Sequence, residues 1–247
     1  MIADIVSVID ASLAIASAVA VVAGLIHGFA GFGVGLVLVP SLAILLGPVE
    51  AVAIAGIASI AATAQLIPGA VRVMDRRLIW PILVPTPFAV VAGTQLLVVI
   101  DPLIMQRSMG AIVFALGLVL FFGFRWRARR SIGAGVSVGL LGGFLGGGTS
   151  MGGPIFTTYI LSSEVGARSM RGSILVVTTT VSVFTVTALA VSHAIELETV
   201  TRSAVIFLPN ALGIWAGAKL FDKSADATYR RVALALLLII GLAAMIA

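Results

Sequence analysis

The sequence predicts an all-α integral membrane protein made of two inverted repeats, each with a re-entrant or broken helical hairpin and three transmembrane helices. The first observation is composition: 60% of the 247 residues are hydrophobic and 10% are charged, whereas soluble domains are about 25% charged. The second is that apolar runs recur along the whole chain, at lengths that indicate helices and not the short alternating strands of a barrel. The third is an internal repeat.

Apolar segments lie between clusters of charge and Gly or Pro breaks, and we expect each of them to be helical. They are 5–26, 33–47, 49–69, 78–100, 103–124, 133–144, 150–161, 169–192, 203–221 and 229–247. Most can span a bilayer, but 133–144 and 150–161 reach only about half of a roughly 30 Å hydrocarbon core. We expect repeat 1 at 1–124, a cytoplasmic linker at 125–132 and repeat 2 at 133–247, within a single membrane domain.

Two pairs of segments carry the internal repeat. The stretch "HGFAGFGVGLVLVP" at 27–40 matches "GGFLGGGTSMGGP" at 142–154, with Gly28 placed on Gly143. Later, "VPTPFAVVAGTQL" at 84–96 matches "LPNALGIWAGAKL" at 208–220, so that Thr86 and Asn210 are equivalent. Each of these follows a proline, which we expect to kink its helix. Each half therefore begins with a Gly-rich break and continues with three spans.

Basic residues decide whether the halves are parallel or inverted, because Lys and Arg are retained on the cytoplasmic side. If each break is the tip of a re-entrant hairpin, each half has three spans and the second half is inverted. Thirteen of the fifteen Lys and Arg residues then lie inside. If the broken segments crossed the membrane instead, the tally would fall to eight against seven. The inverted arrangement, with both termini outside, is favoured.

The glycines predict a polar site inside the membrane, since a hairpin tip leaves backbone groups that only protein or a water-filled cavity can satisfy. The second legs are expected to begin at 33–35 and 149–150, where free N–H groups carry the positive ends of helix dipoles. Two such ends would hold an anion with the N–H groups of 31–35 and 146–150. The alternative is that these glycines only let helices pack closely.

The candidate substrate-binding residues combine the two breaks with polar residues inside spans. They are Gly31, Phe32, Gly33, Gly146, Gly147, Gly148, Thr149, Ser150, Gln65, Thr86 and Asn210. His27 adjoins the first tip, where it either takes up a proton or makes a structural hydrogen bond. The run 178–180 consists of three threonines and directs at most one hydroxyl inward. No carboxylate falls inside a span, so we expect no metal, no cofactor and no cationic substrate.

With "GFAGFGVGLVLVP" and "GGFLGGGTSMGGP" in hand, the chain resembles the sulfite exporter TauE/SafE family of bacterial membrane proteins. The resemblance extends over essentially the whole chain, although the first motif has Phe32 where the second has Gly147. It implies a multi-pass protein of the bacterial cytoplasmic (inner) membrane. The implied activity is transport of sulfur-containing anions such as sulfite, sulfonates, sulfoacetate or thiosulfate.

The resulting hypothesis is a secondary transporter that works by alternating access and is not an enzyme. Its expected partners are a small anion, the lipid bilayer and, as a candidate, a second copy of the chain in a homodimer. No nucleic acid is expected, because the basic residues lie in loops where topology accounts for them. One alternative is a channel-like anion pathway. A membrane-embedded enzyme or assembly factor is the other, and the sequence lacks the nucleophile, paired carboxylates or neighbouring histidines that an enzyme would need.

Overall fold

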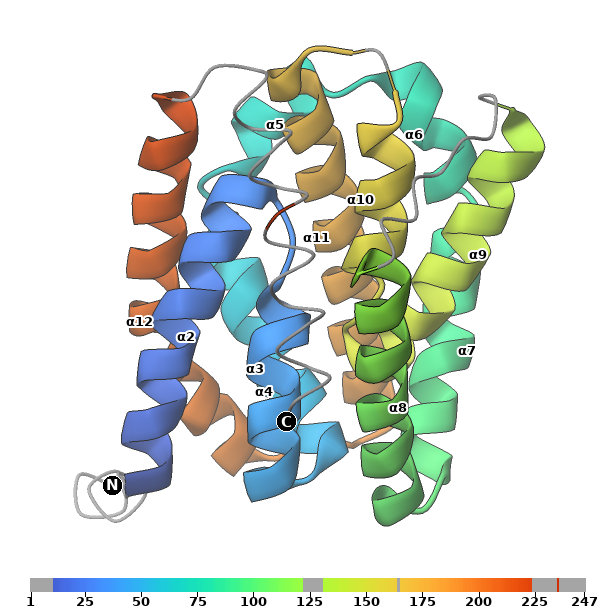
Figure 1. Cartoon of the computed structure of the whole chain (residues 1–247). Helices are drawn as coiled ribbons and strands as arrows, with labels where there is room; N and C mark the ends of the chain where they lie inside the picture. The colour runs from blue at the N-terminus through green and yellow to red at the C-terminus, as the bar shows by residue number, and fades with distance from the viewer. Residues whose placement is uncertain (1–10, 122–130, 164, 224–234, 236–247) are drawn as a thin grey trace.

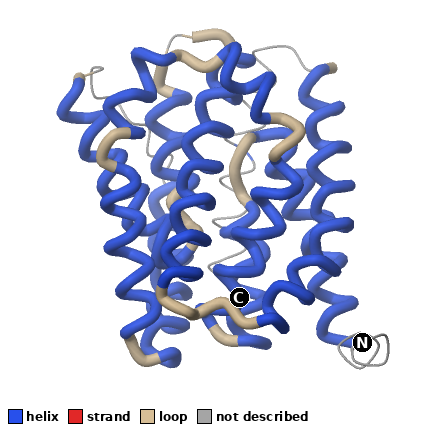
Figure 2. The backbone as a smooth tube through the Cα atoms, turned by 180° about the vertical axis from the view of Figure 1, so that it is seen from behind, coloured by secondary structure: helices blue, strands red, loops and turns tan. Residues whose placement is uncertain are grey.

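The computed structural model describes residues 11–121, 131–163, 165–223 and 235, and these form a bundle of helices joined by short loops (Figures 1 and 2). No strand occurs among the described residues. The helices are α2 (Ala11–Ala30), α3 (Val34–Leu46), α4 (Pro48–Thr63), α5 (Ile67–Val73), α6 (Arg76–Leu83), α7 (Thr86–Val99), α8 (Pro102–Phe121), α9 (Ile132–Thr149), α10 (Gly153–Leu161), α11 (Ala167–Val191) and α12 (Leu197–Asp222). The prediction of an all-helical chain is confirmed for this part.

Side chains at the helix starts explain several boundaries. The Asp75 carboxylate accepts hydrogen bonds from the N–H groups of Arg77 and Leu78, and thereby caps α6. Ser131 accepts one from the N–H group of Ala134 at the start of α9. Such caps satisfy N–H groups that have no partner within the helix. The predicted linker at 125–132 lies largely outside the described residues, which resume at Ser131.

Three helices of the described chain are long and apolar enough to cross a membrane, namely α9, α11 and α12. Two bent pairs raise this number to five if each pair is one span: α4 with α5, bent by 74°, and α6 with α7, bent by 41°. Pro85 lies at the second bend, as expected for a kink. Pro209 lies inside α12, which runs as one helix from 197 to 222, so no break accompanies this second proline.

Two hairpins enter the bundle from opposite ends. In Figure 1, α2 rises from the lower end and α3 returns to it, while α9 descends from the upper end and α10 returns to the upper end. Their turns, at residues 31–33 and 150–152, lie inside the bundle between its two ends. Each hairpin packs extensively on a long helix of the other half of the sequence, α2 on α12 and α9 on α7.

The second break lies later in the sequence than expected. We predicted that the second leg begins at Thr149 or Ser150, but α9 continues through the run Gly146–Gly148 and α10 begins only at Gly153. That prediction is wrong, and so is the short first leg at 133–144, because α9 has 18 residues. Within this run, α7 packs directly on the backbone of Gly147 and Gly148. A Cβ atom on Gly147 would lie 2.2 Å from the Val90 carbonyl oxygen.

The same glycine contact occurs in both halves and corrects the alignment of the two motifs. Gly28 lies against the Ile214 carbonyl as Gly147 lies against that of Val90. Ile214 and Val90 are 124 positions apart, as the sequence predicts, but Gly28 and Gly147 are 119 apart rather than 115. The structural alignment of the two motifs is therefore offset by four residues, about one helical turn, from the alignment that the sequence suggests. Glycines recur at this spacing in the motifs, so the sequence alone does not distinguish the two alignments.

Candidate functional site

The two breaks meet and border one partly open cavity of about 50 Å³. A Cβ atom on Gly35 would lie 1.9 Å from the Ser150 carbonyl oxygen, and one on Gly153 would lie 3.2 Å from the Phe32 Cβ atom. The turns are therefore in direct contact, and α4 and α11 complete the walls. The lining residues are His27, Phe32, Gly33, Val34, Gly35, Ala55, Gly56, Ser59, Ser150, Gly152, Gly153, Phe156, Thr178, Val181, Ser182 and Thr185.

Unusual backbone conformations make the turns possible. Gly33 has φ 117°, a positive value that residues with a side chain rarely adopt, and it leads directly into α3. Ser150 ends α9 in the left-handed region at φ 59°, a conformation that costs a non-glycine residue about 1–3 kcal/mol and needs support from its surroundings. Support comes from Thr149, whose hydroxyl donates to the Leu145 carbonyl at 2.7 Å and accepts from the N–H group of Met151.

The N-termini of two half-helices border this cavity. The first residues of α3 and α10 lie in its wall, and neither N-terminus has a side-chain cap. N–H groups in a first helical turn lack partners within the helix, and they carry the positive end of the helix dipole. The cavity is therefore a place where backbone groups favour negative charge. Pro154 at the start of α10 has no N–H group, so α3 offers more donors.

Six polar side chains complete the lining: His27, Ser59, Ser150, Thr178, Ser182 and Thr185. Thr185 is 1% exposed and its hydroxyl has no partner within the described chain. The His27 ring is 5% exposed; its Nε2 atom lies 3.4 Å from the Thr63 hydroxyl, and its Nδ1 atom has no partner there. Buried polar atoms are rarely left without a partner, and these two atoms belong to residues of the cavity wall and have hydrogen-bonding capacity that the described chain leaves unused.

Arg171 fastens the first break from outside the cavity. Its guanidinium donates to the carbonyls of Gly28 and Phe29 at the end of α2 and lies 4.3 Å above the Phe221 ring. A cation at a helix C-terminus interacts favourably with the negative end of the dipole. No sequence pattern reveals these contacts, which join residues 143 and 142 positions apart. Thr178 on the same helix α11 places its hydroxyl 3.1 Å from the Gly31 carbonyl oxygen.

Of the residues predicted to bind substrate, Phe32, Gly33 and Ser150 line the cavity, and so does His27. The other residues at the breaks do not appear in its wall: Gly31, Gly146, Gly147, Gly148 and Thr149. Gly146, Gly147 and Gly148 lie in α9 against Val181, Val90 and Gly93. These three contacts are those of packing glycines.

The three polar residues predicted from within spans also lie away from the cavity. Gln65 is exposed at the bend between α4 and α5, where its Nε2 atom donates to the Ala62 carbonyl. Thr86 is fully buried between α7 and α9, with its hydroxyl 2.7 Å from the Ile82 carbonyl oxygen. Asn210 is fully buried where α12 meets Gly24 of α2.

We did not predict from the sequence the hydroxyl groups that α4 and α11 contribute to the cavity lining. We expected only that at most one hydroxyl of the three threonines at 178–180 points inward. Ser59 lies on α4, and Ser182 and Thr185 lie on α11, four and seven residues after Thr178. That spacing places residues on one face of a helix. A polar stripe inside an apolar helix was the available signal.

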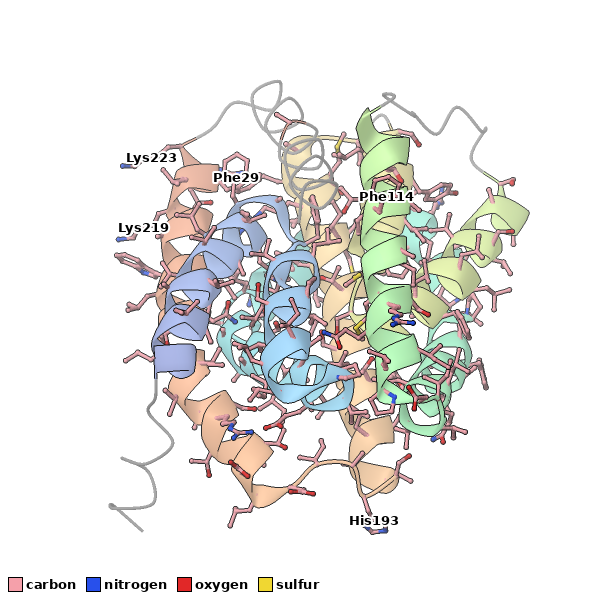
Figure 3. The ribbon with its side chains drawn as sticks, turned by 60° about the horizontal axis from the view of Figure 1, so that its bottom comes forward. Phe29, Phe114, His193, Lys219 and Lys223 are labelled. Atoms are coloured by element: carbon pink, nitrogen blue, oxygen red, sulfur yellow. The ribbon has the colours of Figure 1, made fainter. Side chains whose placement is uncertain are left out.

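Charge divides the described bundle into two ends. The upper end in Figure 1 carries Arg72, Arg76, Arg77, Arg168, Arg171, Lys219 and Lys223, at the ends of α5 and α12 and the starts of α6 and α11. Figure 3 shows Lys219 and Lys223 extending outward from α12, with His193 at the opposite end. At the lower end, Arg202 forms ion pairs with Glu50 and Glu198.

Comparison with known proteins supplies the family. The model of the family described as Sulfite exporter TauE/SafE matches residues 16–244. No curated protein and no solved structure shows a significant match. The match covers nearly the whole chain, including both breaks and every residue that lines the cavity. The chain therefore belongs to the sulfite exporter TauE/SafE family, a family of membrane transporters and not of enzymes.

Proposed function

We propose that this protein is a secondary transporter that moves a small sulfur-containing anion, of the sulfite, sulfonate, sulfoacetate or thiosulfate class, across the bacterial cytoplasmic membrane. The observation that carries the proposal is the meeting of two uncapped half-helix N-termini, those of α3 and α10, at one cavity inside the bundle. Paired half-helix dipoles inside a membrane protein are suited to an anion. The family supplies the class of anion.

In this proposal, the anion is held by backbone N–H groups of the first turns of α3 and α10, and side chains around the cavity add further hydrogen bonds. Hydrogen bonds to a charged acceptor are about twice as strong as neutral ones. Gly35 and Gly153 bring the backbone to the cavity wall without an intervening side chain. Phe32 and Phe156 lie in the same wall and exclude water from one side, which strengthens the electrostatic attraction.

We further propose that the halves are inverted repeats within a single membrane domain, repeat 1 at 1–124 and repeat 2 at 133–247. Support comes from the opposite directions of the two hairpins (Figure 1) and from the doubled contact of Gly28 and Gly147 with the other half. The positive-inside rule then assigns the arginine-rich upper end to the cytoplasm. Alternating access follows if each hairpin moves together with the helix on which it packs, α2 with α12 and α9 with α7. We propose three partners: the lipid bilayer, the anion and a second copy of the chain in a homodimer.

The test is a thermal-shift screen of the detergent-purified protein against sulfite, sulfate, thiosulfate, taurine, sulfoacetate and carboxylate controls. A ligand at about 100 times its Kd stabilises the folded state by about 2.7 kcal/mol. We expect sulfur oxyanions to raise Tm and the carboxylates to leave it unchanged.

Ser59→Leu, which fills the cavity, should abolish this rise. Ser137→Leu is the matched control, because Ser137 is exposed on α9 and away from the cavity. If sulfur anions fail to raise Tm of the unmodified protein, or if Ser59→Leu retains the whole rise, the proposed site is wrong. Large single-channel currents in planar bilayers would favour the channel-like alternative.

A further inference from the structure

We propose that anion binding is coupled to uptake of one proton by His27, so that the anion and the proton occupy the same cavity and cross together. This inference rests on the proposed function, because it concerns the same site. Its basis is the position of the ring: His27 lines the cavity, is 5% exposed and has an Nδ1 atom without a hydrogen-bond partner in the described chain.

The cavity holds no other ionisable side chain. Its remaining lining residues are glycine, serine, threonine and apolar residues, so hydroxyls and backbone N–H groups are the only other donors. Neutral donors stabilise a negative charge but do not cancel it. A dianion such as thiosulfate, taken from water into a buried site, carries a large desolvation cost unless an opposite charge is nearby. Protonated His27 is the group that supplies this charge.

Both ring nitrogens have a role in the bound state. Nε2 lies 3.4 Å from the Thr63 hydroxyl on α4, and Nδ1 is unpartnered. A neutral imidazole has one N–H group, whereas the imidazolium has two. On binding, a proton from bulk water fills the vacant nitrogen; one N–H group then donates toward Thr63 and the other toward an anion oxygen. When the anion leaves, the proton returns to water.

Charged groups on the neighbouring helices do not replace this role. On α11, Arg171 keeps its positive charge when it donates to the Gly28 and Phe29 carbonyls, but its side chain is not part of the cavity lining and its guanidinium lies over the Phe221 ring. On α4, Glu50 is paired with Arg202 of α12 at the other end of the bundle. The described parts of α2, α3 and α10 contain no Asp, Glu, Lys or Arg. Lys219 of α12 lies over the Trp215 ring.

The proposal is tested by counting protons with isothermal titration calorimetry of the full-length protein. The probes are thiosulfate and sulfate, because these dianions do not themselves titrate near neutral pH, as sulfite does. Titrations in two buffers of different ionisation enthalpy give the number of protons taken up for each anion bound. We expect uptake approaching one proton at about pH 7, and a Kd that rises toward tenfold per pH unit, because His27 is neutral in the free protein and protonated in the complex.

Two variants assign the proton. His27→Gln should bind with no proton uptake and with a Kd that does not change from about pH 6 to about pH 8. His193→Gln is the matched control, since it removes the only other histidine of the chain, which is exposed and far from the cavity (Figure 3); it should behave as the unmodified protein does.

The outcomes separate this inference from the proposed function. Binding of both anions by the unmodified protein without proton uptake overturns the coupling and leaves the anion site intact. Equal proton uptake by His27→Gln overturns the assignment to His27. No binding of any sulfur anion overturns the proposed function and the coupling with it. The count on the unmodified protein decides the coupling even if His27→Gln fails to fold.

Discussion

Replacing Gly147 by alanine tests whether the glycine run of α9 packs against α7 or binds the substrate. The added Cβ atom would lie 2.2 Å from the Val90 carbonyl oxygen and 2.8 Å from two further backbone atoms of Val90. Real Cβ atoms essentially never approach closer than 3.0 Å, so the two helix backbones must separate by about 0.8 Å. The obstruction is backbone and cannot rotate away.

The magnitude follows from two opposing effects. Overpacking of this kind costs about 1–3 kcal/mol, and the clash with rigid backbone puts Gly147→Ala at the upper end. Alanine is intrinsically better than glycine in a helix by about 1 kcal/mol. The expected net loss is therefore about 1–2 kcal/mol. The matched variant is Gly110→Ala in α8, where a Cβ atom would meet nothing within 4 Å, so that only the helix-propensity gain remains.

The assay is thermal unfolding of both purified variants, followed by anion titration. For a chain of this size, each kcal/mol changes Tm by about 2–4 °C. Gly147→Ala should melt several degrees below the unmodified protein, Gly110→Ala slightly above it, and both should bind anions with unchanged Kd. A Gly147→Ala protein with undiminished Tm and lost anion binding would refute the packing argument and return Gly147 to the site.

Three further outcomes are expected. Thr185→Val should raise the anion Kd about tenfold or more, since a hydrogen bond to a charged group contributes about 1.5–3 kcal/mol. Thr180→Val, on the same helix but outside the cavity, should leave the Kd unchanged. Calorimetry measures both Kd values, and equal Kd values for the two variants would remove Thr185 from the site. The chain has no cysteine, so single cysteines at Arg168 and His193 should react with impermeant maleimide only from the cytoplasmic and only from the outer side, respectively; labelling from the same side contradicts the inverted topology. Arg202→Met should lower the free energy of unfolding by about 1 kcal/mol or less in low salt, because the ion pairs of Arg202 are partly exposed. Chemical denaturation measures this change, and a loss of several kcal/mol would show that the ion pairs hold the bundle together.

The helical class and the positions of the two breaks to within a few residues follow from the sequence. Apolar runs of bilayer length leave the backbone no alternative but to satisfy itself within helices. The duplicated stretches 84–96 and 208–220 also have equivalent neighbours in the structure, because a glycine of a hairpin packs against the backbone carbonyl of Val90 and of Ile214. The membership of the TauE/SafE family, suggested by the two glycine motifs, is confirmed by the family match over residues 16–244.

Only the tertiary structure assigned the individual glycines and polar residues. Gly147 and Gly33 look alike in sequence, yet Gly147 lies against the backbone of α7 and Gly33 lines the cavity. Thr86 and Thr185 are both buried hydroxyls, but Thr86 donates to the Ile82 carbonyl of the preceding helix α6 and Thr185 has no partner in the described chain. The sequence determines that a helix must break, since local conformational preference is encoded locally. What each break faces depends on helices that are distant in the sequence, whose approach no local pattern specifies.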